Sequence, residues 1–132
     1  MRIVVDTNVV ISGIFFGGNP RKIIESIVDD AIDSFATTEI IDEYMEIIES
    51  MIKRKRGSFD QRAFSPLFSS LNIINSETEI EMCRDPDDDK FIECAVDAKA
   101  LYIVSGDKDL TDLGQHAGIP ILKYSELLTK LQ

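Results

Sequence analysis

Carboxylates stand at points of the chain where buried strands are expected to end. Asp6 directly follows an apolar run at residues 2–5, and Asp107 stands just beyond a second apolar run at residues 101–105. In open α/β sheets, ligands bind beyond the carboxyl ends of the strands. Like charges gathered at one edge repel each other unless a cation lies between them. The two aspartates therefore predict a cation site at that edge of a sheet.

Helix geometry adds Glu43 to this set. The helix expected over residues 38–52 has an apolar face centred on Tyr44 and Ile48. At about 100° per residue, Glu43 falls at the border of that face. An exposed glutamate at the rim of a helix is the plainer interpretation, but a carboxylate at the border can also face a cleft. Glu43 is therefore a candidate ligand.

Residues 85–89, Asp-Pro-Asp-Asp-Asp, form the densest acidic cluster. In the helix expected over residues 87–99, Asp88 falls on the apolar face, whereas Asp89 is expected to project away from it. Asp88 is therefore the favoured metal ligand of this run, with Asp85 a second candidate if the turn folds back. A helix N-cap is the alternative role for Asp88, because aspartate is a preferred capping residue.

The segment that follows residue 104 is Ser105-Gly106-Asp107-Lys108-Asp109. Gly106 permits a tight turn, and carboxylates two residues apart can bracket one cation. A simple turn-forming aspartate is the plainer interpretation here. What that interpretation leaves unexplained is the combination of acids at Asp6, at Asp107 and at the inward-facing Asp88.

The residue types restrict which metal could bind. The chain has one histidine, His116, and two cysteines, Cys83 and Cys94, which are ten positions apart and match no metal or redox spacing. A zinc site built on imidazole or thiolate lacks ligands, so oxygens would hold any metal, which favours Mg²⁺ or Mn²⁺. The two cysteines are expected to be reduced and partly buried.

Length and composition predict one globular domain over residues 1–132. Hydrophobic residues make up 44% and charged residues 29% of the chain, which is typical of a packed domain. No apolar run approaches the ~20 residues needed to span a bilayer, and Asp6 interrupts the opening apolar run before a secretory signal could develop. We expect a soluble, cytoplasmic protein that does not associate with membranes.

Charge is distributed unevenly along the chain. The net charge is −10, and residues 77–112 hold twelve acids against four bases, a local balance of −8. Residues 53–62 instead balance at +4, through Lys53, Arg54, Lys55, Arg56 and Arg62 against Asp60. An acidic chain repels nucleic acid at long range, but bound cations and a basic segment that anchors phosphate could reverse this locally. A solvated helix end is the alternative interpretation of the basic segment.

Strands and helices are expected to alternate along almost the whole chain. Short strands are expected at residues 2–5, 32–36, 71–75, 101–105 and 119–122, and helices at 8–15, 20–31, 38–52, 60–71, 87–99 and 125–131. Thr37 or Thr38 is expected to cap the third helix, and Pro66 to weaken the fourth. This alternation is typical of an α/β fold with a parallel sheet covered by helices on both faces.

Four segments together resemble the PIN domains. Residues 4–12 (VVDTNVVIS) resemble their opening motif, and Glu43 stands where those domains carry a helical glutamate. Residues 84–93 (RDPDDDKFIE) and 102–110 (YIVSGDKDL) are similar to the third and fourth acidic motifs of the PIN subfamily found among toxins of toxin–antitoxin pairs. One departure is Ser105, which replaces a commoner threonine and keeps the hydroxyl. The four motifs, in order, cover residues 4–110.

The resemblance implies a three-layer α/β/α fold with a short, mostly parallel central sheet. It also implies hydrolysis of RNA that depends on Mg²⁺ or Mn²⁺, a small antitoxin protein as partner, and a homodimer as an allowed state, although no heptad pattern supports self-association. The implied metal-binding and catalytic set is Asp6, Glu43, Asp88 and Asp107, with Asp109 at a second metal. Asn8, Ser105 and Asp85 would orient ligands or phosphate. Which of Asp85, Asp88 and Asp89 serves in the third motif stays open.

Two other functions are compatible with parts of this pattern. Asp6-Thr7-Asn8 approximates the Asp-x-Asp motif of haloacid-dehalogenase-type phosphatases, and Asp107 with Asp112 resembles their last motif. In those enzymes the second aspartate acts as acid and base, which the amide of Asn8 cannot do. A PIN-like scaffold that binds RNA or protein without cutting is the second alternative.

Overall fold

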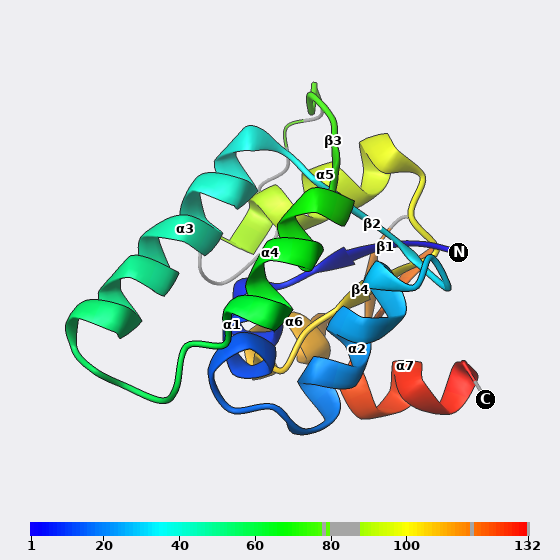
Figure 1. Cartoon of the computed structure of the whole chain (residues 1–132). Coiled ribbons are helices and arrows are strands. Elements are labelled where there is room, and N and C mark those ends of the chain that lie inside the picture. Colours follow the sequence, from blue (N-terminus) through cyan, green and yellow to red (C-terminus); the bar gives the residue numbers. More distant parts are fainter. Residues whose placement is uncertain (78, 80–87, 117, 132) are drawn as a thin grey trace.

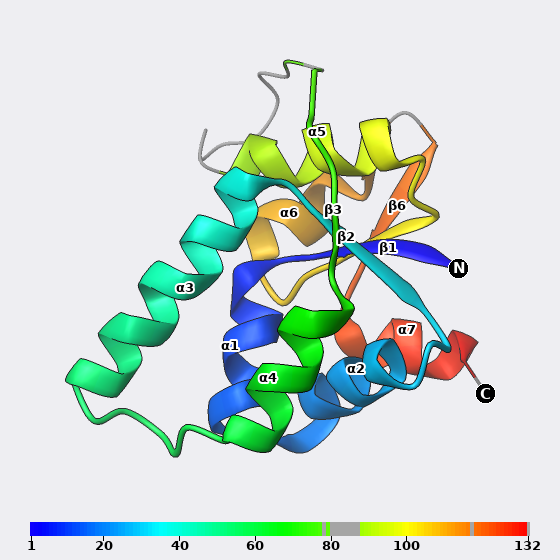
Figure 2. The same ribbon diagram turned by 45° about the horizontal axis from the view of Figure 1, so that its top comes forward.

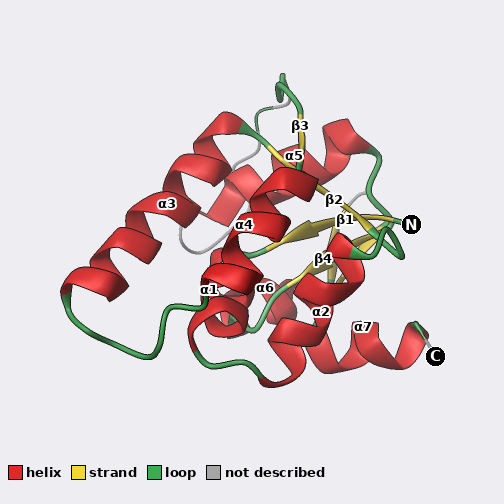
Figure 3. Cartoon of the chain, viewed as in Figure 1, coloured by secondary structure: helices red, strands yellow, loops and turns green. Residues whose placement is uncertain are grey.

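The computed structural model describes residues 1–77, 79, 88–116 and 118–131, with strands and helices alternating along the chain (Figures 1 and 3). The elements are β1 (Arg2–Val5), α1 (Thr7–Phe15), α2 (Gly18–Val28), β2 (Asp33–Ala36), α3 (Thr38–Lys53), α4 (Gln61–Ser70), β3 (Asn72–Ile73), α5 (Asp89–Ala98), β4 (Tyr102–Val104), α6 (Lys108–Leu113), β5 (Gln115–His116), β6 (Ile119–Leu122) and α7 (Tyr124–Lys130).

The strands form one sheet in the order β3-β2-β1-β4-β6-β5. Neighbouring strands are parallel, except that β5 pairs antiparallel with β6 at the edge. From β1 the chain winds outward to β2 and β3, and it then returns to place β4 on the other side of β1. The winding thus reverses between β1 and β4, which is where ligands bind in sheets of this type.

Helices cover both faces of the sheet (Figure 2). Helix α5 packs on one face against β1, β2 and β4, while α1, α2, α4 and α7 gather on the other face and α3 flanks the sheet. The expected three-layer α/β/α fold with a short, mostly parallel sheet is confirmed. Among the described residues, no helix is both long enough and apolar enough to cross a membrane.

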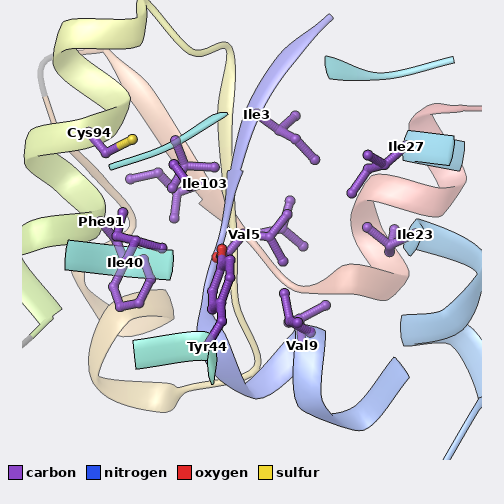
Figure 4. Packing of buried hydrophobic residues seen from close by; sticks show 14 of the residues in the cluster. Ile3, Val5, Val9, Ile23, Ile27, Ile40, Tyr44, Phe91, Cys94 and Ile103 are labelled. Carbon is purple, nitrogen blue, oxygen red and sulfur yellow. The ribbon is translucent and has the colours of Figure 1, made fainter. Parts of the chain in front are cut away.

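The core lies on both sides of β1, which explains why that strand is apolar without alternation. Ile3 and Val5 face Ile23 and Ile27 of α2, while Phe91 of α5 lies on the opposite side of the strand (Figure 4). All five side chains are buried. The sheet edge that carries the candidate site therefore rests on a closely packed centre.

Several element boundaries differ from the sequence-based expectation. The antiparallel strand β5 and the short helix α6 were not predicted, and the second helix spans Gly18–Val28 rather than residues 20–31. The helix expected over residues 60–71 is α4, Gln61–Ser70, with Pro66 in its interior, where the missing N–H removes one intrahelical hydrogen bond. As expected, Thr37 caps α3, its side chain accepting a hydrogen bond from the N–H of Ile40 at 3.2 Å.

Cys94 of α5 is buried and free, as expected, and burial raises the pKa of its thiol to about 12. A thiol with that pKa is protonated and inert at neutral pH. Cys83 lies outside the described residues.

Candidate active site

The site begins where β1 and β4 end side by side. Val5 lies opposite Val104 in the parallel register, so the next residues of the two strands, Asp6 and Ser105, are neighbours. The backbone N–H of Asp6 donates to the carbonyl of Val104 at 2.8 Å, and the Ser105 hydroxyl donates to Oδ2 of Asp6 at 2.7 Å. Asp6 is only 4% exposed and Ser105 is fully buried. Strand pairing alone therefore places a buried, oriented carboxylate at the point where the winding reverses.

Ser105 also connects Asp6 with Asp107. The N–H of Asp107 donates to the Ser105 hydroxyl at 2.9 Å, so one hydroxyl accepts from the backbone of one aspartate and donates to the side chain of the other. The two acids that the sequence places after separate strands are thus joined through one residue.

The carboxylates lie close enough to influence each other. Burial raises the pKa of Asp6 to about 6; the hydrogen bond from Ser105 opposes this shift, and the negative charges of Asp107 and Glu43 add to it. Three acids far apart in the sequence therefore contribute to one electrostatic environment. Such an environment favours a proton or a cation beside Asp6.

Helix α3 brings Glu43 to this edge. Its neighbour Tyr44 is fully buried and donates a hydrogen bond to the carbonyl of Val5, which fixes α3 against the end of β1. The Glu43 side chain is 28% exposed, so the expected position at the border of the buried face is confirmed. Its Oε2 accepts a hydrogen bond from the hydroxyl of Thr7, the residue after Asp6.

Lys90 is a site residue that sequence reasoning missed. Its Nζ lies 2.7 Å from Oε1 of Glu43, and its side chain is only 8% exposed. The ammonium of Lys90 beside this carboxylate offsets part of the repulsion among the acids. The available signal was its place directly after three consecutive aspartates, within a segment that holds few bases.

The structure describes residues 88–93 of the third motif. Asp88 occupies the N-cap position of α5, but its side chain makes no capping hydrogen bond, and its Oδ2 is buried. The expectation that Asp89 projects away from the buried face is wrong, because Asp89 is 7% exposed. Helix α5 begins at Asp89 rather than at residue 87, and its first turn packs near α3, so both Asp89 and Lys90 are covered.

The remaining sequence candidates fall elsewhere. Asn8 is exposed in the first turn of α1. Asp85 lies outside the described residues, and so does the side chain of Asp109, although the backbone of Asp109 belongs to α6. Asp85 and Asp109 therefore remain sequence-based candidates.

The donor set fits a hard cation by its chemistry. Carboxylates and hydroxyls from Asp6, Glu43, Asp107, Thr7 and Ser105 surround this edge, and oxygen ligands suit Mg²⁺ or Mn²⁺. Across the described ranges, no three His, Cys, Asp or Glu side chains are already gathered tightly enough to hold a metal. The ion pair with Lys90 accounts for one oxygen of Glu43.

Comparison with known proteins identifies the family. A protein-family model described as a PIN domain matches residues 2–109. An uncharacterized protein of Methanocaldococcus jannaschii, MJ1680, is 36% identical over 118 residues, which cover 86% of this chain and 75% of that protein. A chain in the crystal structure of VapBC2 from Rickettsia felis, bound to a DNA fragment from their promoter, has the same fold, with a TM-score of 0.62 and 13% identity over 93% of this chain and 98% of that one. The four acidic motifs and the winding around Asp6 thus have a common explanation: the chain belongs to the PIN-domain family.

Proposed function

We propose that this protein is a ribonuclease that hydrolyses RNA phosphodiester bonds with the help of carboxylate-held Mg²⁺ or Mn²⁺. The observation that carries the proposal is the state of Asp6. It is a buried carboxylate, oriented by Ser105, at the reversal point of the sheet, and the charges of Asp107 and Glu43 act on it. A divalent cation there would remove the electrostatic penalty that burial and like charges impose.

The residues that would hold the metal are Asp6, Glu43, Asp88 and Asp107, with Asp109 at a second position. When bound, Mg²⁺ or Mn²⁺ supplies a water of lowered pKa and a positive charge that stabilises the leaving oxygen.

Other residues of the chain would position these ligands. The Ser105 hydroxyl fixes the Asp6 carboxylate, and Thr7 and Lys90 hold the two oxygens of Glu43. Asn8, exposed beside Asp6 at the start of α1, would contact the phosphate, and Asp85 would orient a ligand of the third motif.

We further infer that the protein is the toxin of a type II toxin–antitoxin pair. The third and fourth motifs resemble those of PIN toxins, and a chain of the VapBC2 structure shares the fold. The proposed partner is a small antitoxin encoded by a neighbouring reading frame, and a homodimer is an allowed state. Co-expression of that neighbour should relieve any growth arrest caused by the toxin, whereas the absence of both arrest and a neighbouring frame would contradict this role.

Cleavage of a labelled RNA tests the nuclease proposal. We expect cleavage with Mn²⁺, none with EDTA, and none in Asp6→Asn or Asp107→Asn, while both variants unfold cooperatively as folded domains do. Glu46→Gln is the matched control, because Glu46 is an exposed acid on α3, the helix that also carries Glu43. Full activity of either aspartate variant, or cleavage in EDTA, would refute the assignment.

A scaffold that binds RNA or protein without cutting is the second candidate, and one observation favours it. Lys90 and Thr7 engage both oxygens of Glu43. Under this alternative, Mn²⁺ would not stabilise the fold and RNA would be bound intact. The family match over residues 2–109 argues against the haloacid-dehalogenase-type phosphatase.

A further inference from the structure

The loop that follows α3 concentrates positive charge in an acidic protein. Four consecutive basic residues, Lys53 at the end of α3 and Arg54, Lys55 and Arg56 after it, stand here in a chain of net charge −10. All four are exposed, and within the described part of the chain none forms an ion pair. All four charges are therefore exposed to solvent.

The backbone of this loop is fixed rather than loosely extended. The N–H of Arg56 donates to the carbonyl of Met51 at 3.0 Å, and the N–H of Ser58 donates to the carbonyl of Phe15 in α1 at 3.2 Å. Gly57 between them has φ of +67°, a conformation that favours glycine. A preformed backbone lowers the entropy lost when a ligand binds to the loop.

An aromatic side chain stands beside the basic loop. Phe16 is 67% exposed, and its Cε1 lies 3.0 Å from the position that a Cβ on Gly57 would occupy. Exposed aromatic rings next to basic side chains are typical of surfaces that bind single-stranded nucleic acid, because bases stack on the ring while the cations pair with phosphates.

The charge is not uniform within the loop. Lys53 and Arg54 border a shallow surface hollow of about 580 Å³ that they share with Glu46 and Glu49, whose charges offset theirs. Lys55 and Arg56 lie further along and directly precede Gly57, whose backbone lies beside Phe16. Neither lines the hollow that holds Glu46 and Glu49, so their charges are less offset than those of Lys53 and Arg54.

The loop and the candidate active site are opposite ends of one rigid element. Glu43 precedes Lys53 by ten residues within α3, a separation of about 15 Å at ~1.5 Å per residue. Figure 1 shows α3 running from the sheet edge out to this loop. The basic loop is therefore separated by about 15 Å along α3 from the acidic site, which on its own repels phosphate.

We propose that Lys55, Arg56 and Phe16 form an anchoring surface for single-stranded RNA, remote from the cleavage site. The inference rests on the proposed ribonuclease function and adds to it the place where the substrate is held. Charge complementarity favours a phosphate backbone over a protein partner, because exposed cations stand beside an exposed ring in a chain of net charge −10.

Binding without cleavage tests the surface. Fluorescence anisotropy of fluorescein-labelled polyuridine is measured in EDTA over a series of KCl concentrations, for the wild type, the double variant Lys55→Gln/Arg56→Gln, and Phe16→Leu. The double variant should lose about tenfold or more in affinity for RNA. The negative slope of log K against log salt should become less steep by about 1.4. Phe16→Leu should lose about fivefold or more with an unchanged slope, because stacking is not electrostatic.

The matched control is Lys22→Gln/Lys99→Gln, which removes the same two charges from exposed sites elsewhere. If the control variant binds RNA with the affinity of the wild type, the anchoring surface is supported. Equal losses in the control, or wild-type affinity in the loop variants, would overturn it. The proposal would also be overturned if the wild type sediments as a dimer, Phe16→Leu sediments as a monomer, and the affinity for RNA is the same in both.

Cleavage of RNA is measured in a separate assay with Mn²⁺. A wild type that binds RNA through the loop but never cuts would contradict the ribonuclease proposal and leave this surface intact. If the wild type cuts RNA and the loop variants bind RNA with wild-type affinity, the ribonuclease proposal is supported and the anchoring surface is refuted.

Discussion

The ammonium of Lys90 lies 2.7 Å from the Glu43 carboxylate, and this ion pair joins α5 to α3 at the edge of the candidate active site. Lys90 is buried and Glu43 nearly three-quarters buried, so neither charge is fully solvated. The pair gives the acidic site an internal positive charge and fixes the position of one of its acids.

Removing one partner of this pair should destabilise the protein. Lys90→Met leaves Glu43 partly buried without its cation, and we expect a loss of about 1–3 kcal/mol in the free energy of unfolding. Urea denaturation of Lys90→Met, Glu43→Gln and the double variant would measure the coupling. The double variant should recover part of the loss. Strictly additive effects would mean that the pair contributes nothing to stability.

Asp6 should make stability depend on pH. Its native pKa of about 6 lies above its ordinary value of 3.8, so the native state binds the proton more tightly than the unfolded state does. In EDTA, this group's contribution to stability is therefore fully present below pH ~4 and lost as pH rises towards ~6, by about 3 kcal/mol in total.

Asp6→Asn tests this dependence directly. The variant cannot ionise at this position, so its free energy of unfolding should be flatter between pH 4 and 6, and higher than that of the wild type at neutral pH. A wild-type slope that persists in the variant would show that another group is responsible.

Ser105 should matter through its hydroxyl. Ser105→Ala removes the donor to Asp6 and the acceptor for the N–H of Asp107, and we expect a loss of about 1–3 kcal/mol in stability. Ser105→Thr retains the hydroxyl and should preserve most of the stability. If threonine were as damaging as alanine, packing rather than hydrogen bonding would explain the effect.

A divalent cation should stabilise the fold if the proposed function is correct. At a Mn²⁺ concentration of about 100 times Kd, binding adds about 2.7 kcal/mol to the free energy of unfolding and raises Tm. Differential scanning calorimetry should show this rise in the wild type and in Glu46→Gln, and a much smaller rise in Asp107→Asn. No rise in the wild type would favour the scaffold that binds without cutting.

Gly57 should resist substitution more than Gly114 does. Both have positive φ, at +67° and +79°, but a Cβ on Gly57 would stand 3.0 Å from Phe15 and Phe16, whereas nothing lies within 4 Å at Gly114. Gly114→Ala should therefore cost only the ~1–2 kcal/mol of backbone strain, and Gly57→Ala more. If thermal unfolding shows equal losses of stability in Gly57→Ala and Gly114→Ala, the loop around Gly57 moves enough to accommodate the added methyl group.

Sequence patterns predicted the parts of the site that depend on local geometry. Asp6 was predictable because it directly follows an apolar strand. Glu43 was predictable because the constant rotation per residue of a helix places it beside the apolar face that Tyr44 marks. Both rules need only neighbouring residues. The closeness of Asp6 to Ser105 depends on β4 being the neighbour of β1, which the structure shows and the alternation of strands and helices alone does not specify.

Tertiary packing decided what the sequence could not. Asp89 falls on the polar side of an ideal helix, yet it is buried because the first turn of α5 packs near α3. Lys90 has no apolar period to mark it as buried, and its ion pair with Glu43, a residue distant in sequence, contributes to its position. The short elements β5 and α6 carry too few residues for a periodic signal.

The hydrogen bond between Ser105 and Asp6 spans 99 positions of the chain. During translation, β1 emerges from the ribosome long before β4 exists to pair with it. A nascent chain therefore holds Asp6 without its partner strand, and the hydrogen bond that orients its carboxylate forms only after Ser105 has left the ribosome.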